Sequence, residues 1–148
     1  MIDMAEFKGY LVKFGSVALP NSYIKMDSGN TSTPNQREEL KATRNDNTRK
    51  LYRVTADGMI SQFSIVIRQL TNVQMSALRN VMNKGLLDKK QRKYDVTFWD
   101  DEELCYKNAP MYIPDITYER IMVGDNFVLY NSFTMEFIGY EAGTVVSG

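Results

Sequence analysis

The sequence predicts an α+β fold, namely an antiparallel β-sandwich or barrel with one flanking α-helix. Segments that alternate apolar and polar residues lie on both sides of one amphipathic helical stretch. A parallel βαβ fold needs helices between successive strands, and the sequence shows only one helix. The chain has 148 residues, of which 43% are hydrophobic and 11% aromatic. These values predict a single folded domain over residues 1–148.

The N-terminal part predicts two extended pieces. Apolar residues alternate with other side chains from Tyr10 to Phe14, Gly15 predicts a turn, and a second extended piece ends near Met26. Pro20 marks a break or an edge position.

A long polar arm follows, at about residues 28–50. Its central run, from Ser32 to Lys50, reads STPNQREELKATRNDNTRK, and Leu40 is its only large apolar residue. Such a segment cannot bury enough apolar surface to offset its own ordering entropy. Long loops without structure in compact domains are usually functional or disordered. We therefore expect the arm to be mobile in the isolated subunit and to become ordered on something other than its own core.

The strand pattern resumes at Leu51. Asp57-Gly58 is a hairpin-type turn signal between two β-rich runs. In the second run, Phe63, Ile65 and Ile67 share one face of a predicted strand.

One helix is predicted from about Asn72 to Lys84. Thr71 and Gln74 match a capping box, and Gly85 stands where a C-cap glycine belongs. The apolar stripe of this helix consists of Met75, Leu78, Val81 and Met82.

Two hairpins complete the predicted fold. The first has a strand from Tyr94 to Trp99, a turn at DDEE, and an alternation that restarts at Leu104 and Tyr106. The second joins DITYERIMV to FVLYNSFTMEFIGY across residues 124–126. A loose C-terminal tail is expected at about residues 141–148. The predicted core consists of Phe63, Ile65, Ile67, Leu78, Met82, Val96, Phe98, Phe133, Met135 and Phe137.

Composition excludes several classes of function. The formal net charge is zero, which gives no support to non-specific nucleic-acid binding. The chain has no histidine and a single cysteine, Cys105, so the usual general base, the usual nucleophile pairs and an intramolecular disulfide are missing. We expect no enzyme, no cofactor and no metal. No secretory signal and no membrane-spanning apolar run is visible.

Two charge clusters of opposite sign remain. The acidic cluster, Asp100 to Glu103, either binds a divalent cation or forms a solvated turn, and we favour the turn because adjacent acids in a hairpin rarely converge on one point. The basic cluster, Lys89 to Lys93 in KKQRK, is either solvated surface, a phosphate contact or a charged protein interface. Cys105 has no base partner and is interpreted as a structural thiol.

The order of segments resembles a known family. FGSVALPNSYIKMDSG, an arm ending in TRK, QFSIVIRQL, TNVQMSALRNVM, YDVTFWD and YNSFTMEFIGY follow one another from about Phe14 to Tyr140. This layout resembles small tail proteins of long-tailed bacteriophages, a family known mainly as a domain of unknown function. It is similar to tail-tube proteins and to the N-terminal domain of distal tail proteins.

The resemblance implies a tail-tube-like fold and a structural role in the virion. The implied assembly is a homo-oligomeric, hexameric ring in the tail tube or at the tail-tip or baseplate adaptor. Its channel would pass DNA without sequence-specific contact. The implied partners are copies of the chain and other tail proteins, with no membrane and no small-molecule substrate, and the chain would be made in the cytoplasm of the bacterial host. In such rings the arm reaches over a neighbouring subunit or ring.

The alternative from a different class is a soluble, monomeric β-sandwich module that binds a carbohydrate or a peptide through aromatic residues such as Trp99 and Tyr106. A histidine-free hydrolase is a distant third. For the ring, we predict that the arm and the two charge clusters, which bracket one strand, meet neighbouring subunits. The predicted interface residues are Arg37, Glu38, Glu39, Leu40, Lys41, Arg44, Arg49, Lys50, Lys89, Lys90, Arg92, Lys93, Asp100, Asp101, Glu102 and Glu103.

Overall fold

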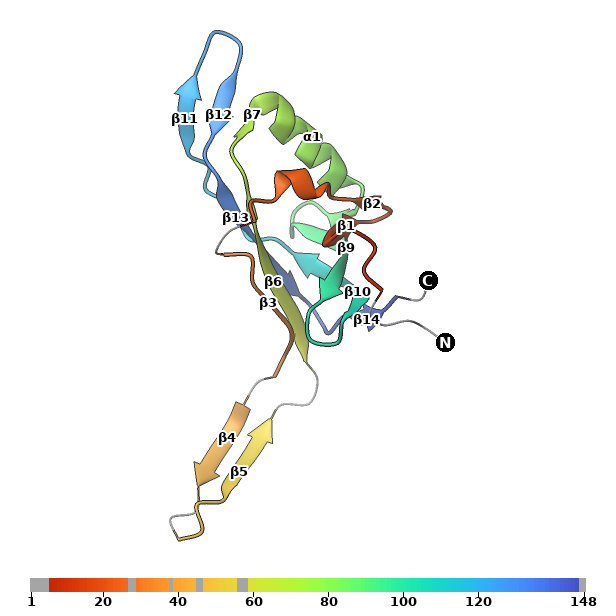
Figure 1. The fold of residues 1–148 in the computed structure, drawn as a ribbon, viewed down its shortest axis with the longest axis vertical. Helices are drawn as coiled ribbons and strands as arrows, with labels where there is room; N and C mark the ends of the chain where they lie inside the picture. The colour runs from red at the N-terminus through yellow and green to blue at the C-terminus, as the bar shows by residue number, and fades with distance from the viewer. Residues whose placement is uncertain (1–5, 27–28, 38, 45–46, 56–58, 147–148) are drawn as a thin grey trace.

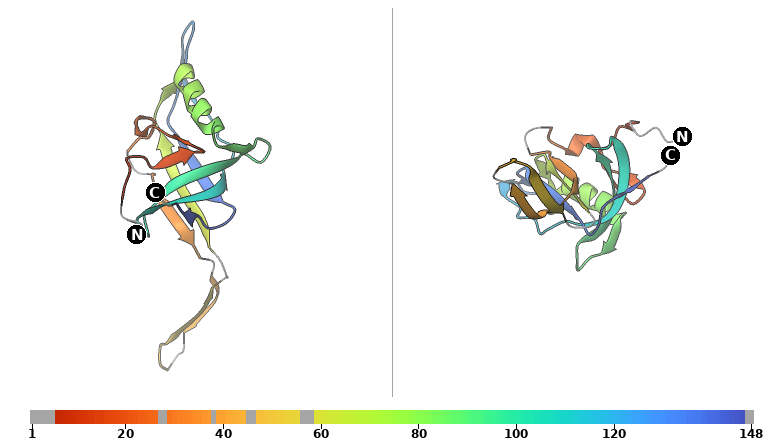
Figure 2. Two further views of the ribbon diagram at one scale, coloured as in Figure 1. Left: turned by 90° about the vertical axis from the view of Figure 1, so that its right-hand side faces the viewer. Right: turned by 90° about the horizontal axis from the view of Figure 1, so that it is seen from below.

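The computed structural model describes residues 6–26, 29–37, 39–44, 47–55 and 59–146. Within these ranges the chain forms antiparallel strands and one α-helix, which confirms the α+β class and a sandwich-like arrangement (Figure 1). Two narrow hairpins project from opposite ends of the body (Figure 1; Figure 2, left).

The body is a nine-stranded antiparallel sheet whose main path runs β2-β1-β9-β10-β13-β6-β3. Strand β8 pairs with β9, and β14 pairs with β10, off this path. The strands of this sheet are β1 (Val12–Phe14), β2 (Val17–Ala18), β3 (Ser32–Gln36), β6 (Ile60–Ile67), β8 (Leu86–Asp88), β9 (Lys93–Asp100), β10 (Cys105–Tyr112), β13 (Phe133–Gly139) and β14 (Thr144–Val145).

The sheet bends so that its two halves face each other across the core. Phe63 of β6 stacks on Phe137 of β13 at a centroid distance of 4.4 Å and lies 5.2 Å from Phe98 of β9. The ring of Phe14 lies 5.8 Å from that of Phe137. These contacts join strands from both halves, and aromatic pairs of this kind add to the stabilisation from area burial.

The predicted core is confirmed with one exception. Nine of the ten predicted side chains are buried, namely Phe63, Ile65, Ile67, Leu78, Met82, Val96, Phe98, Met135 and Phe137. Phe133 is only partly buried and packs against the edge of this cluster. It is the first residue of β13, where the strand leaves the core, and so the alternation alone overestimated its burial.

The N-terminal prediction is confirmed in outline. β1 and β2 form a tight hairpin, and the short 3-10 helix η1 (Asn21–Tyr23) leads to a bridge between Ile24 and Ile67. Gly15, in the turn, has a φ of 58°. A Cβ at this position would lie 2.4 Å from the carbonyl oxygen of Lys84, so both the conformation and the close approach require glycine.

Helix α1 (Asn72–Asn83) closes one end of the bent sheet. The predicted capping box is present, because the Thr71 hydroxyl accepts from the Gln74 N–H and the Gln74 side chain accepts from the Thr71 N–H. Of the predicted stripe, Met75, Leu78 and Met82 are buried and Val81 is partly buried. Gly85 follows the helix, and a Cβ there would lie 2.7 Å from the Asp95 carbonyl oxygen, so close backbone approach explains this glycine.

The polar arm is not an irregular loop. Residues 32–36 form β3 at the edge of the main sheet, where they pair with β6. Strand β4 (Glu39–Arg44) pairs with β5 (Leu51–Thr55) in a separate two-stranded sheet. The chain thus goes out through β3 and β4 and returns through β5 and β6, and the β4–β5 hairpin extends beyond the body (Figure 1).

The hairpin expected across Asp57-Gly58 is wrong. Both residues lie outside the described ranges. In the described part of the chain, the strands on either side do not pair with each other, because β5 pairs with β4 while β6 pairs with β3 and β13. Strand β5 instead forms a hairpin with the preceding strand β4, while β6 joins the main sheet between β3 and β13.

The C-terminal hairpins follow the prediction. β9 and β10 pair along their whole length, and β11 (Arg120–Val123) pairs with β12 (Val128–Tyr130). Strand β7 (Leu70–Thr71) adds to β12 and completes a three-stranded sheet at the end of the body opposite to β4–β5 (Figure 1). The tail is not loose up to residue 146, because β14 pairs with β10 and the Val146 N–H donates to the Tyr106 carbonyl. Residues 147–148 lie outside the described ranges.

Candidate functional site

A buried polar cluster lies where the arm leaves the body. Asp100, at the end of β9, has no exposed surface, and Lys107 of β10 is 5% exposed. Their charged atoms are 2.8 Å apart. Asn35 of β3 donates to the Asp100 carboxylate over 3.1 Å and accepts from Lys107 over 3.0 Å. The cluster therefore connects the root of the arm to the β9–β10 hairpin.

The remaining acidic residues of the turn also have partners within the chain. Glu103 forms a second ion pair with Lys107 at 2.8 Å, and Glu102 pairs with Arg37 at 2.9 Å. The Ser32 hydroxyl donates to Asp101. The predicted turn is confirmed, since residues 101–104 form an exposed turn, but it is not solvated throughout. Asp100 lies inside, and the other three acidic residues bind β3, Arg37 or β10 from the surface.

The hydrogen bonds in this cluster favour the charged forms. Burial is the largest single influence on Asp100 and opposes its ionisation, but donors from Lys107, Asn35 and the backbone of Glu102 and Glu103 together hold its pKa below the ordinary value. For Lys107, burial likewise opposes the charge, while its two carboxylate partners raise the pKa above the ordinary value. The Arg37 hydrogen bond holds the pKa of Glu102 below its usual range.

The basic cluster is at the other end of β9. Lys89 and Lys90 are exposed in the turn between β8 and β9. Arg92 donates to the Ile113 carbonyl over 2.6 Å and lies 3.7 Å from Asp115, while the Lys93 ammonium lies 4.8 Å from the Tyr140 ring. The two charge clusters do not meet within the chain. Asp100 is fully buried in its ion pair with Lys107, so the prediction that it faces a neighbouring subunit is wrong. Pairing of the exposed residues of the two clusters between subunits stays a prediction.

The structure places the predicted interface residues of the arm on the projecting hairpin. Arg37 precedes the hairpin and is exposed, and Glu38 lies outside the described residues. Arg49 and Lys50 are exposed in the connection from β4 to β5. On β4 the structure places the backbone of Glu39, Leu40, Lys41 and Arg44.

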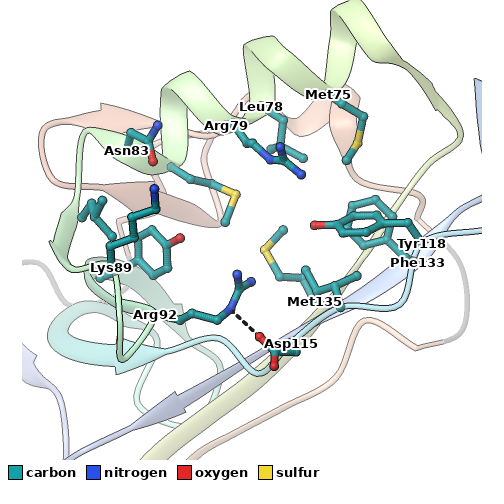
Figure 3. Close-up of a pocket in the computed structure, with 14 residues that line it drawn as sticks. Met75, Leu78, Arg79, Asn83, Lys89, Arg92, Asp115, Tyr118, Phe133 and Met135 are labelled. Carbon is teal, nitrogen blue, oxygen red and sulfur yellow. Dashed lines mark ion pairs between the residues drawn. The ribbon is translucent and has the colours of Figure 1, made fainter. Parts of the chain in front are cut away.

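A groove runs along α1 on the side that faces the segment between β10 and β11. Two adjoining cavities of about 530 and 400 Å³ share Met75, Arg79, Asn83 and Tyr118 as lining residues. Figure 3 shows Met75, Leu78, Phe133 and Met135 around the hollow of the larger cavity, with Arg79, Lys89 and Arg92 among the side chains that surround it. Sequence reasoning assigned the methionines to the core and missed this groove.

The aromatic residues proposed for a binding module, Trp99 and Tyr106, pack against other aromatic rings of the same chain. The Phe7 ring lies 5.2 Å from Trp99 in an edge contact, and Tyr10 stacks on Tyr106 at 4.5 Å. The Tyr106 hydroxyl donates to the Tyr10 carbonyl and accepts from the Lys8 N–H. This cluster attaches the N-terminal segment to β9 and β10 and does not present an open ring face at Tyr106.

The β11–β12 hairpin exposes apolar side chains to an unusual extent. All four residues of β11 are exposed, and the exposed fractions reach 55% at Met122 and 71% at Val123. Ile121 and Phe127 are also exposed. An apolar projection of this kind marks an interaction surface more often than a single exposed side chain does.

Two observations concern metal binding and the reactivity of the single cysteine. They contain no group of three or more histidine, cysteine, aspartate or glutamate residues arranged to hold a metal ion. Cys105 is buried, and burial raises the pKa of its thiol, which disfavours the reactive thiolate. No helix in the described ranges has the length and apolar character needed to cross a bilayer.

Comparison with known proteins identifies a family. Residues 4–140 match a family described as a family of unknown function (DUF6711). The chain belongs to this family. The match covers nearly the same part of the chain as the resemblance described above, from the N-terminal strands to the end of β13.

No curated protein matches the chain. Among solved structures, one similar chain belongs to the tail of an empty GTA particle, computed with helical refinement and C6 symmetry. The two chains share 10% sequence identity with a TM-score of 0.42, over 96% of this chain and 98% of that chain.

Proposed function

We propose that the chain is a structural subunit of a bacteriophage tail that assembles with copies of itself into a hexameric ring. The ring belongs to the tail tube or to the tail-tip or baseplate adaptor, has a tail-tube-like fold, and surrounds a channel that passes DNA without sequence-specific contact. The proposed role is not enzymatic, and its location is the virion. The resemblance in the order of segments and the shape of the subunit support this role.

The observation that carries the proposal is the β4–β5 hairpin. In the described part of the chain, β4 and β5 pair with each other and with no other strand. The hairpin stands away from the body (Figure 1; Figure 2, left). A two-stranded hairpin alone is marginally stable in water at best. Such an element gains stability when a second surface covers it or extends its sheet, and a neighbouring subunit supplies that surface in a ring.

Side-chain contacts hold the chain to the body just before the hairpin begins. Asn35 is buried between Asp100 and Lys107, and Arg37 pairs with Glu102 just before β4 begins. These contacts fix the point at which the arm leaves the body. A fixed starting point suits a hairpin that has to contact the same surface on each neighbouring subunit.

A monomeric peptide-binding module is the second candidate, and the methionine-lined groove beside α1 favours it. Methionine side chains adapt to different partners, and the larger cavity, at about 530 Å³, falls within the usual range for ligand pockets. A carbohydrate ligand has less support, because the aromatic rings at Trp99 and Tyr106 are packed against Phe7 and Tyr10.

Solution mass at several concentrations separates the two candidates. The ring subunit forms hexamers or longer polymers as the concentration rises, whereas the binding module stays monomeric. A variant that lacks residues 39–55, closed by a short Gly-Ser linker, should keep the melting temperature of the body but lose assembly. A wild-type chain that remains monomeric throughout, or a deletion variant that assembles normally, would overturn the proposal.

A further inference from the structure

We propose that the tip of the β11–β12 hairpin inserts into the groove beside α1 of a second copy of the chain. The tip is defined here as residues 121–127 and the groove as the two cavities that share Met75 and Arg79. This inference rests on the proposed self-assembly and names one of its contacts. The contact joins two different surfaces, so each copy can use both at once.

The tip carries an apolar surface and one negative charge. Met122 and Val123 are 55% and 71% exposed, and Phe127 lies beside them at the turn. The turn is tight, because the Gly124 N–H donates to the Phe127 carbonyl over 2.9 Å. Asp125 is the only charged residue in the sequence from 121 to 130. The tip therefore presents apolar side chains around a single carboxylate.

The groove has the complementary character. Its floor contains Met75, Leu78 and Met135, and methionine adapts its shape to an inserted side chain. The same lining set includes Arg79, Lys89 and Arg92 but only one carboxylate, that of Asp115, which lies 3.7 Å from Arg92. An apolar floor beside an excess of positive charge suits an apolar segment with an acidic residue.

The tip does not reach the groove of its own chain. Strand β12 pairs with β7 through Leu129 and Thr71, and the Val128 N–H donates to the Asn72 side chain over 3.1 Å. These contacts hold the base of the hairpin at the start of α1, and the hairpin extends from there past the end of the helix (Figure 1). The smaller cavity begins beside the base of the hairpin, at Asn72 and Tyr130, and the larger one extends away from it, along α1 toward Lys89.

A projection that fits a pocket elsewhere on the same molecule makes a heterologous contact. Repetition of such a contact closes into a ring or continues as a helical filament. A ring and a helical filament are both assemblies that a tail subunit could form. The two-fold alternative, in which two apolar tips pack against each other, would instead give a closed dimer.

Cysteine cross-linking distinguishes these arrangements. Asn126→Cys places a thiol at the tip, and Asn83→Cys places one at the groove, at two exposed positions. The native Cys105 is buried and serves as the internal control. A disulfide requires Cα atoms about 4.4–6.8 Å apart, so a link reports direct contact. We expect covalent dimers on mild oxidation when the two variants are mixed and not from either variant alone.

A charge exchange tests the same contact without a covalent bond. Asp125→Arg should raise the concentration needed for half-assembly about tenfold at low salt, and Arg79→Asp in the same chain should restore most of the loss. Glu141→Arg makes the same charge change at an exposed site away from the hairpin and should have little effect. Thermal melting of each variant verifies that the fold is intact.

The outcomes separate this inference from the proposed function. Assembly of the wild type without a mixed cross-link, or with links between two Asn126→Cys tips, would overturn the tip-and-groove contact and leave the ring intact. A wild-type chain that stays monomeric would overturn both proposals.

Discussion

The β9–β10 and β4–β5 hairpins are both rich in charged residues, yet they lie in opposite environments. The β9–β10 hairpin is in the middle of the main sheet, and its turn begins at a fully buried aspartate. The β4–β5 hairpin lies outside the body and pairs with no other strand in the described part of the chain. Charge content alone therefore does not decide whether a hairpin is buried.

The phase of the strand explains the burial of Asp100. Asp100 follows Tyr94, Val96 and Phe98 at spacing two, so it continues the inward face of β9. Lys107 falls on the inward face of β10 with Cys105 and Ala109 in the same way. Each charge is buried because of its position on its strand, and each is tolerated because the oppositely charged atom lies 2.8 Å away.

The positions of Asp100 and Lys107 in their strands can be read from the sequence, but the ion pair between them depends on how β9 and β10 pair. From β9 alone, an acidic residue next to three others is most simply a turn. Only the pairing of Asp100 with Cys105 brings Lys107 within reach, and Asn35 comes from a strand that the polar composition hid. The fold class, the helix with its cap, and nine core positions depend on local periodicity, so they were predictable. The cluster and the groove depend on contacts between distant segments and were not. The β4–β5 pairing is local, but the polar composition of β4 concealed it.

The largest expected effect is in the body. Phe98→Ala should lower the free energy of unfolding by about 3–5 kcal/mol, because the ring is fully buried and leaves a cavity. Phe133→Ala, which the sequence alone grouped with it, should cost only about 1–2 kcal/mol because its ring is partly buried. Urea melts measure both values. Equal losses would show that the two positions are buried alike.

Substitution of Lys107 should lower the free energy of unfolding nearly as much as Phe98→Ala does. Lys107→Met leaves the buried Asp100 carboxylate without its cation, and breaking such a pair costs about 3–5 kcal/mol. The double variant that also carries Asp100→Asn should be more stable than Lys107→Met alone, because no buried charge is then left unpaired. If the double variant loses the sum of both single effects, the two groups are not coupled.

The same cluster makes stability depend on acid. Asp100 has a folded pKa below its ordinary value of 3.8, so the folded state binds fewer protons than the unfolded state between these two values. Its contribution is present above about pH 4 and is lost as the pH falls through the folded pKa. Unfolding of the wild type and of Asp100→Asn should be measured between pH 2 and 6. The variant should show the flatter profile, and parallel profiles would exclude this role for Asp100.

The smallest expected effect on stability concerns the basic cluster. Reversal of Lys89 and Lys90 to glutamate should change the free energy of unfolding by less than about 0.5 kcal/mol, because both side chains are exposed. It should nevertheless weaken assembly at low salt, and Asp101→Lys should partly restore it if the two clusters meet between subunits. Sedimentation at two salt concentrations measures this. Unchanged assembly after the reversal would exclude the basic cluster from the interface.

Limited proteolysis of the free subunit and of the assembly tests the central claim most directly. The claim is that the body is stable by itself, whereas the β4–β5 hairpin needs a neighbour. Cleavage should be rapid between residues 39 and 55 in the free subunit and slow in the assembly, while β9–β10 resists in both forms. Equal protection of the hairpin in the two forms would contradict the account.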